Sequence, residues 1–123
     1  MAIRQSAEDY LETILVLQQR LGQVRSIDIV NELGYSKPSI SVAMKKLRES
    51  GHVLMAGDGT LTLTDSGLAI AREVYDRHTV ISGLFRLLGV PDEIAAEDAC
   101  KVEHHLSEKT FLCIREFIEK NAK

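Results

Sequence analysis

Apolar residues recur every three or four positions over most of the chain, a spacing typical of amphipathic helices. The first such run begins after Ser6. Ser6 and Asp9, three residues apart, together resemble a capping box. Its apolar positions are Tyr10, Leu11, Ile14, Leu15 and Leu17. Gly22 follows the run and is suited to the left-handed residue that ends many helices. The pattern therefore predicts a first helix that opens at Ser6 and ends at Gly22.

Two shorter helices are predicted next, separated by a turn of three to four residues that contains Gly34. Ser26 caps the first of them, which covers residues 27–33. Ser36 caps the second, with Pro38 in its first turn, where a missing backbone N–H costs nothing. The apolar positions of this second helix are Ile40, Met44 and Leu47, with Ala43 alongside. Two helices joined in this way are typical of a helix-turn-helix.

Two short runs of strand-forming residues follow at 53–56 and 60–63, on either side of the turn Gly57-Asp58-Gly59. Such runs around a glycine turn predict a β-hairpin. A basic helix followed at once by a β-hairpin is the pattern of a winged helix-turn-helix. We therefore assign residues 1–64 to a DNA-binding domain of this type.

Residues 65–123 are predicted to be helical, so the fold class is mainly α. A long helix runs to about Leu88 and ends at the break Gly89-Val90-Pro91-Asp92, and Ser107 caps the last helix. The apolar band of that last helix consists of Phe111, Leu112, Ile114, Phe117 and Ile118. Cys113 lies in the band and is assigned to packing. A small helical domain offers little to bury such a band except a partner subunit, so we expect a homodimer.

Composition limits the class of protein. A chain of 123 residues, 45% of them apolar, fits one globular unit or two small lobes that share a core. No apolar run approaches the ~18 residues that span a bilayer, and the polar N-terminus lacks the apolar stretch of a signal peptide. We expect a soluble, cytoplasmic protein without membrane contacts. No phosphate-binding loop or nucleophile motif is present, so we expect no enzyme and no organic small-molecule substrate.

The net charge of −3 is unevenly distributed along the chain. Between Ser36 and His52, four basic residues accompany one acidic residue, and this local excess of positive charge can face DNA phosphates. The candidate DNA contacts are Arg25, Ser36, Lys37, Ser39, Ser41, Lys45 and Lys46. The alternative is that the lysines form an ordinary solvated helix face. The hairpin that follows favours DNA binding.

A thiol, a carboxylate and an imidazole occur at Cys100, Glu103 and His104. On a continuous helix this spacing places all three groups on one face, and each of them can bind a metal ion. The alternative is that Cys100 is a small buried residue while Glu103 and His104 are solvated. The two cysteines of the chain make no disulfide framework, and in a reducing compartment a thiol beside Glu and His is better explained as a ligand.

Three further residues are weaker metal-binding candidates by themselves. Asp9 and Glu12 share a face of the first predicted helix. The alternatives are that Asp9 belongs to the capping box and that the pair forms a solvated acidic edge. His78 lies alone in the long helix, where a histidine is usually an ordinary surface or core residue.

Several of these segments together resemble the family of the diphtheria toxin repressor and the manganese transport regulator, which are metal-activated bacterial transcription repressors. The matching motifs are AEDYLETI at 7–14, SKPSIS at 36–41, LTLTDSG at 61–67, VYDRH at 74–78, LLGV at 87–90 and EDACKVEHHLS at 97–107. The match covers nearly the whole chain. It implies the short form of the family, without the C-terminal SH3-like domain of the longer members.

The resemblance also implies roles for individual residues. The positions that match the family's primary metal ligands are Asp9, Cys100, Glu103 and His104. Those that match the residues completing a second ion in the manganese branch are Glu12 and His78. The positions that match helix residues approaching DNA are Ser36, Pro38 and Ser39.

The implied metal site differs from both branches of that family. Asp9 agrees with the manganese branch, where the iron branch has Met, whereas Cys100 agrees with the iron branch, where the manganese branch has Glu. Ser82 and Ala96 lack the side chains that would build the iron branch's ancillary site. Thiolate favours Fe(II), Co(II) or Zn(II), and carboxylates suit Mn(II). We expect Mn(II) or Fe(II) as the cofactor, with Co(II) or Zn(II) able to bind in vitro.

We therefore expect a homodimeric, metal-activated repressor that binds double-stranded operator DNA and controls metal homeostasis genes. Residues 65–123 would dimerise and bind metal, and an ion also held by ligands of the DNA-binding domain would couple metal to DNA. One rival is a winged-helix regulator controlled by an organic ligand. Another is a hydrolytic metal centre. A third is a structural zinc site, whose metal removal would unfold the protein.

Overall fold

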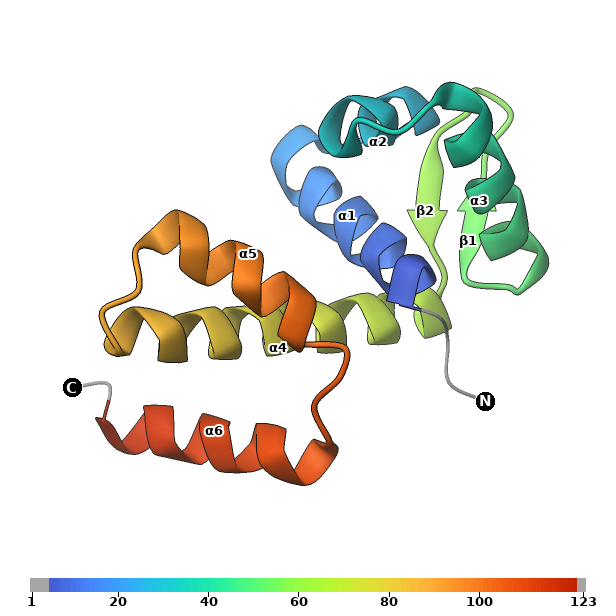
Figure 1. Ribbon diagram of the computed structural model, residues 1–123. Helices are drawn as coiled ribbons and strands as arrows, with labels where there is room; N and C mark the ends of the chain where they lie inside the picture. Colours follow the sequence, from blue (N-terminus) through green and yellow to red (C-terminus); the bar gives the residue numbers. More distant parts are fainter. Residues whose placement is uncertain (1–4, 122–123) are drawn as a thin grey trace. The chain divides into compact units, whose positions relative to one another are not determined.

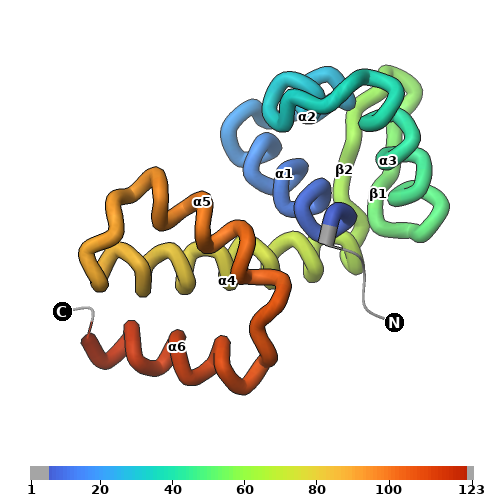
Figure 2. The backbone as a smooth tube through the Cα atoms, in the orientation of Figure 1, coloured from blue at the N-terminus to red at the C-terminus, as the bar shows by residue number. Residues whose placement is uncertain are grey.

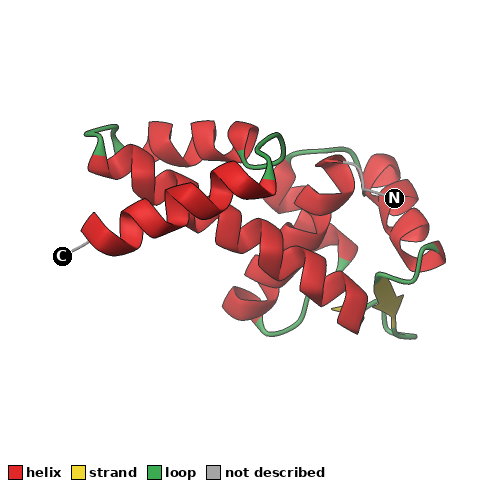
Figure 3. Cartoon of the chain, turned by 90° about the horizontal axis from the view of Figure 1, so that it is seen from below, coloured by secondary structure: helices red, strands yellow, loops and turns green. Residues whose placement is uncertain are grey.

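The computed structural model describes residues 5–121, which form helices and one short hairpin (Figures 1 and 3). In chain order the elements are α1 (Gln5–Leu21), α2 (Ser26–Leu33), α3 (Lys37–Glu49), β1 (Val53–Met55), β2 (Leu61–Leu63), α4 (Asp65–Leu87), α5 (Asp92–Val102) and α6 (Glu108–Asn121). The predicted fold class, mainly α with a winged helix-turn-helix, is confirmed.

The residue contacts divide the chain into two compact units, the first ending at Arg72 and the second beginning at Glu73. Both residues lie within α4, so this helix contributes its first turns to the first unit and its remainder to the second. The functional assignment of residues 1–64 and 65–123 to two domains stays a prediction.

The first unit is organised around one apolar core, to which all three of its complete helices and both strands contribute. The buried members of this core are Leu11, Ile14, Leu15, Leu17, Val24, Ile29, Ile40, Met44, Leu47, Val53, Leu61 and Ala71. The buried residues of α1 and α3 repeat at intervals of three or four, as expected of a helix with one apolar face. Figure 2 shows α2 and α3 joined by a short turn, with the hairpin following α3.

The hairpin is the predicted wing. Strands β1 and β2 are antiparallel, with Val53 opposite Leu63 and Met55 opposite Leu61. The Leu61 backbone N–H also donates to the carbonyl oxygen of Val24 at 2.7 Å, which attaches the hairpin to the segment before α2.

The helix starts of the first unit correct two predictions and confirm a third. Helix α1 includes Gln5, so Ser6 lies inside the helix and is not its cap. Helix α2 begins at Ser26, and its cap is Arg25, whose backbone N–H donates to the Asp28 carboxylate at 2.9 Å. Ser36 caps α3 as predicted, because its hydroxyl accepts from the Ser39 backbone N–H at 3.2 Å.

A pair of tyrosines links α1 to the turn that leads into α3, because Tyr10 belongs to the helix and Tyr35 to the turn. The Tyr10 and Tyr35 rings meet edge to face, with their centroids 6.3 Å apart. Burial raises the pKa of Tyr10, and the neighbouring Tyr35 and Asp9 raise it further. Tyr10 therefore stays protonated through the neutral pH range.

The start of α4 is held closely against the end of α3. The Thr64 hydroxyl donates to the Gly51 carbonyl oxygen at 2.7 Å and accepts from the Gly67 backbone N–H at 3.1 Å. Gly67 is buried, and a Cβ at this position would lie 2.0 Å from the carbonyl oxygen of His52. Glycine is therefore required here by space.

The second unit packs α5 and α6 against the remainder of α4, and in Figure 1 these two helices run along opposite sides of α4. Its buried cluster contains Ile81, Ala99 and Phe111, one residue from each helix. Partly buried apolar residues around it are Val80, Phe85, Val102 and Leu106. Ser107 caps α6 as predicted, since its hydroxyl accepts from the Thr110 backbone N–H at 3.2 Å.

Most of the apolar band predicted on α6 is not buried within the single chain. Phe111 is 4% exposed, but Leu112 is 46% and Phe117 51% exposed. Cys113 is also exposed in the single chain, so its assignment to packing in this band stays a prediction that requires a partner subunit. The second unit therefore keeps an apolar surface available to a partner.

Among residues 5–121, no helix combines the length and the apolar character required to cross a membrane.

The substitution Gly67→Ala tests the close approach of α4 to His52. Because the added methyl group would meet a backbone atom, we expect a loss of about 1–3 kcal/mol in the free energy of unfolding, the usual cost of overpacking. Gly83→Ala in the same helix is the matched control, since its Cβ would meet nothing within 4 Å. Alanine there should stabilise the helix by roughly 0.5–1 kcal/mol. Urea unfolding followed by circular dichroism measures both, and equal effects would contradict the steric role.

Candidate metal centre and DNA-binding surface

The predicted metal ligands of the second unit lie where α5 ends. Cys100 is in the last turn of α5, which ends at Val102. Glu103 keeps helical backbone angles, φ −57° and ψ −29°, and its N–H donates to the Ala99 carbonyl oxygen at 2.9 Å. His104 belongs to the turn that follows. The prediction that all three occupy one continuous helix was therefore wrong for His104, while Cys100 and Glu103 keep their helical relation.

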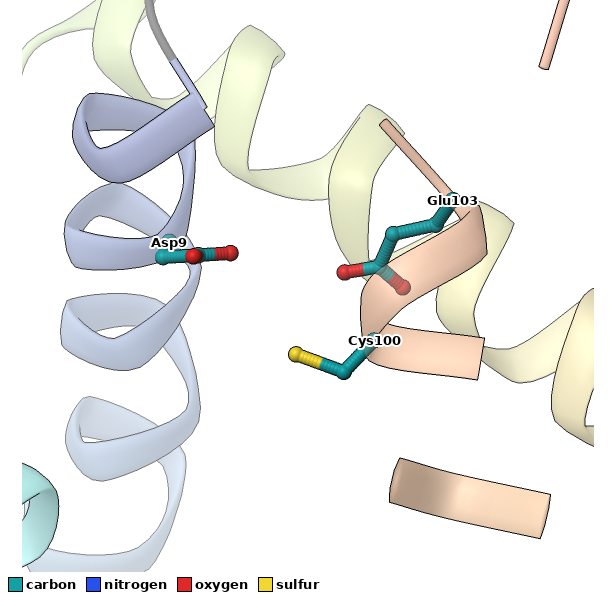
Figure 4. Close-up of side chains that lie close together, drawn as sticks. All are labelled: Asp9, Cys100 and Glu103. Carbon is teal, nitrogen blue, oxygen red and sulfur yellow. The ribbon is translucent and has the colours of Figure 1, made fainter. Parts of the chain in front are cut away.

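The alternative considered for these residues was a buried Cys100 with Glu103 and His104 in solvent, and the structure shows the reverse. Cys100 is exposed, Glu103 is 1% exposed, and the His104 side chain is 3% exposed. The Cys100 Sγ and a Glu103 carboxylate oxygen lie within 4.8 Å of each other. Figure 4 shows both side chains projecting from the same side of this segment. The interpretation of Cys100 as a buried apolar residue, with Glu103 and His104 solvated, does not hold.

Two imidazoles lie beside the buried Glu103 carboxylate. The His78 Nδ1 atom is 3.0 Å from Oε2 and the His104 Nε2 atom is 3.4 Å from Oε1. Among the described residues, Oε1 is buried and makes no hydrogen bond. A buried carboxylate oxygen without a hydrogen bond is costly unless it meets a positive charge or a metal. The donor set of imidazole, carboxylate and thiol fits a divalent transition metal.

The predicted ligands of the first unit lie together on α1. Asp9 and Glu12 are three residues apart on this helix, so they share a face, and both are half-buried. The Asp9 carboxylate projects from the helix in Figure 4. Since Asp9 lies inside α1, its predicted role as the capping partner of Ser6 does not apply.

The residues predicted to contact DNA are all exposed. On and before α3 they are Ser36, Lys37, Pro38, Ser39, Ser41, Lys45 and Lys46. Within residues 5–121, no carboxylate forms an ion pair with any of these lysines. The buried residues of α3 are Ile40, Met44 and Leu47, so its polar and basic positions remain accessible. The first unit therefore presents one helix whose positive charge is not neutralised locally.

Arg25 is placed differently from the other candidates. Besides capping α2, its guanidinium lies 3.8 Å from the carboxylate of Asp58 in the hairpin turn. The Thr60 backbone N–H donates to Asp58 and lowers the pKa of that carboxyl, which stays ionised. Part of the Arg25 charge is thus already matched by the wing.

Three residues that the sequence interpretation did not select stand out in the structure. Tyr35 and Val42 are apolar but 53% and 55% exposed, next to and within α3. Val42 lies between the buried positions Ile40 and Met44, and this offset was the available signal for its exposure. Arg77 contacts the turn that carries Glu103, and no sequence signal indicated that contact.

A winged helix-turn-helix together with a second helical unit that carries a cluster of candidate metal ligands is typical of metal-dependent, DNA-binding regulators. Two family models cover almost all of the chain. The iron dependent repressor N-terminal DNA binding domain matches residues 3–61, and the iron dependent repressor metal binding and dimerisation domain matches residues 64–123. The chain belongs to this family of metal-dependent transcriptional repressors, which are not enzymes.

Individual relatives agree with the family. The transcriptional regulator MntR of Escherichia coli O6:H1 is 35% identical over 118 residues, which cover 96% of this chain and 76% of the relative. Among solved structures, a manganese-dependent transcriptional repressor in complex with manganese matches with a TM-score of 0.84 and 28% identity over 92% of this chain. The IdeR of T. acidophilum matches with a TM-score of 0.80 and 26% identity over all of it. The chain spans only 52% and 56% of those two solved chains.

The substitution Glu103→Gln tests whether the buried carboxylate exists for metal binding. Without metal, we expect the variant to be at least as stable as the parent, because a charge without full compensation is removed from the interior. With Mn(II) at about 100 times its dissociation constant, the parent should gain about 2.7 kcal/mol and the variant nothing comparable.

Thermal unfolding with and without Mn(II) measures both effects. The control is Glu97→Gln, which removes an exposed carboxylate of α5 that pairs with Lys101 at 3.9 Å. An unchanged response to metal in Glu103→Gln would contradict the ligand role.

Proposed function

We propose that this protein represses transcription by binding operator DNA through α3 and the wing when a divalent metal occupies a site centred on Glu103. The observation that carries the proposal is the buried Glu103 carboxylate, flanked by two imidazoles and with one oxygen that accepts no hydrogen bond from the described residues. A bound divalent cation would give this oxygen the partner that it lacks among the described residues.

The proposed ligands come from both units. His78, Cys100, Glu103 and His104 belong to the second unit, and their positions match the family motif. Asp9 and Glu12 of the first unit match it too, and we propose that they complete the coordination. Ligands drawn from two units would be satisfied together only in one arrangement of those units. Metal would then favour that arrangement, which is the differential contact that allosteric control requires.

We propose Mn(II) or Fe(II) as the activating metal. The related solved structure contains manganese, and carboxylates such as Asp9, Glu12 and Glu103 are hard oxygen ligands that suit Mn(II). Cys100 adds a softer thiolate, which favours Fe(II), Co(II) or Zn(II). The position of Cys100 also bears on whether one or two ions bind, because a thiolate replaces a carboxylate there.

We propose that the second unit forms a homodimer, as its match to a metal binding and dimerisation domain supports. The exposed apolar residues of this unit provide surface for it: Tyr75, Leu87, Leu88, Ile94, Leu112 and Phe117. A twofold dimer would present two copies of α3 to two half-sites of an operator. A protein that reads operator DNA works in the cytoplasm, and we expect no organic small-molecule substrate.

In DNA recognition, we propose that Ser39 and Ser41 approach base edges and that Lys37, Lys45 and Lys46 bind phosphates. The Ser36 hydroxyl is already engaged as the helix cap, so its contact with DNA would come from the N-terminal end of α3 as a whole. Pro38 occupies the first turn of the same helix, and Arg25 would reach the phosphate backbone from beside the wing.

Operator binding is predicted to depend on metal. The experiment measures binding to the DNA upstream of the protein's own gene, first with a chelator and then with Mn(II), Fe(II) under anaerobic conditions, Co(II) and Zn(II). We expect binding only with metal, and its loss in His104→Ala with helicity and dimer retained. Equal binding in chelator would overturn metal control, and unfolding in chelator would indicate a structural zinc site.

Lys46→Ala is predicted to weaken binding to all DNA sequences alike. Loss of one phosphate contact should reduce the slope of log K against log salt concentration by about 1, without changing the preferred sequence. The matched control is Lys109→Ala, an exposed lysine on α6 outside the DNA-binding unit. Fluorescence anisotropy across a salt series gives both slopes. A specific loss at one base pair instead would assign Lys46 to base recognition.

A further inference from the structure

Arg77 lies beside the proposed metal ligands without being one of them. Its side chain is only 13% exposed. Its Nη1 donates to two backbone carbonyl oxygens, that of Glu103 at 2.8 Å and that of Leu106 at 3.0 Å. One guanidinium nitrogen therefore bridges the two ends of the turn between α5 and α6.

Neither carbonyl oxygen accepts a backbone hydrogen bond from the turns and caps of the described residues. The last carbonyls of a helix have no donor within the helix, and α5 ends at Val102. Glu103 is the residue that follows α5, and Leu106 lies just before the Ser107 cap of α6. A positively charged donor at this point hydrogen-bonds both carbonyls. It also interacts favourably with the negative end of the α5 dipole.

The rest of the Arg77 side chain is fixed as well. Its Nη2 atom lies 3.5 Å from the Glu108 carboxylate in the first turn of α6. Its guanidinium carbon lies 4.9 Å from the centre of the Phe111 ring, which belongs to the core of the second unit. A planar guanidinium can combine this stacking with several directed hydrogen bonds, which a lysine ammonium cannot do.

Adjacent residues of α4 therefore hold the two parts of Glu103. Arg77 holds its backbone through the carbonyl oxygen, and His78 contacts its carboxylate at 3.0 Å. His104 lies inside the same bridged turn and places its Nε2 3.4 Å from that carboxylate. One arginine thus holds both ends of the turn that carries two proposed metal ligands.

We infer that Arg77 is a positioning residue for metal binding: it fixes the turn 103–106 so that Glu103 and His104 are preorganised for a divalent cation. The inference rests on the proposed function, since it concerns the same site. If the turn is not fixed in advance, the cost of ordering it is subtracted from the free energy of metal binding. Partners that orient metal ligands in this way typically contribute about 10- to 100-fold to metal affinity.

Arg115 provides a matched control for this inference. Its guanidinium carbon lies 4.8 Å from the centre of the same Phe111 ring, and it pairs with Asp76 on α4. In contrast to Arg77, it makes no hydrogen bond to residues 103–106 among the described residues. Arg77→Met and Arg115→Met therefore both remove a stacked guanidinium, but only the first removes the bridge across the turn.

The experiment measures the dissociation constant for Mn(II) by electron paramagnetic resonance, together with the apo-protein melting temperature and amide hydrogen exchange at residues 103–106. We expect Arg77→Met to weaken Mn(II) binding about 10-fold or more and to speed exchange in the turn, and Arg115→Met to stay within about threefold of the parent. Arg77→Lys keeps the charge but not the planar fork, and should recover only part of the affinity. If Arg77→Met does not fold, Arg77→Lys takes its place in the comparison with Arg115→Met.

Parent-like affinity in the Arg77 variants, or an equal loss in Arg115→Met, would overturn the inference and leave the metal site itself standing. A parent protein that binds no Mn(II), Fe(II), Co(II) or Zn(II) would instead overturn the proposed function, and this inference with it.

Discussion

Burial of the Glu103 carboxylate is the constraint on which the second unit depends. Removing a carboxylate from water costs several kcal/mol unless nearby charges and hydrogen bonds compensate. Here His78 and His104 lie beside its oxygens, and Arg77 holds the backbone of the same residue. Positive or potentially positive groups therefore converge on one position from α4 and from the turn after α5. A fold selected only for stability would place an apolar residue there, and a charged one indicates a bound partner for that charge.

The first unit solves a different electrostatic problem. Its core takes the apolar face of α3, namely Ile40, Met44 and Leu47, and leaves the lysines of that helix outside without carboxylate partners among residues 5–121. The protein as a whole is acidic, with a net charge of −3, so this local positive charge is specific to one surface. The two units together separate a buried negative site from an exposed positive one. This separation matches the two tasks of the family, metal binding and DNA binding.

The sequence predicted the elements well because Ser, Gly and Pro mark their ends. Ser36 and Ser107 cap the helices expected of them, and the hairpin lies where the glycine turn placed it. One error occurred where two residues compete for one role. Arg25 rather than Ser26 is the cap of α2, because the Asp28 side chain closes the turn one residue earlier.

The candidate site was predictable in its residue types but not in its packing. Regular spacing placed Cys100, Glu103 and His104 on one helix, whereas α5 stops before Glu103 and His104 reaches the carboxylate from the following turn. Glu103 is buried and contacts Arg77 and His78 of α4, while Cys100 is exposed, and spacing along the chain does not reveal this difference. The role of Arg77 depends on backbone carbonyls 26 and 29 residues away, and no local pattern encodes such a contact.

The contact between Tyr10 and Tyr35 has an optical consequence. The protein has three tyrosines and no tryptophan, so tyrosine dominates its intrinsic ultraviolet emission. Two of those three emitters are the rings that meet edge to face between α1 and the turn before α3. One directly follows Asp9 and the other directly precedes Ser36 in the chain. The first unit thus contains its own spectroscopic reporter where α1, the helix of the acidic pair, meets the turn into α3, with no label or added chromophore.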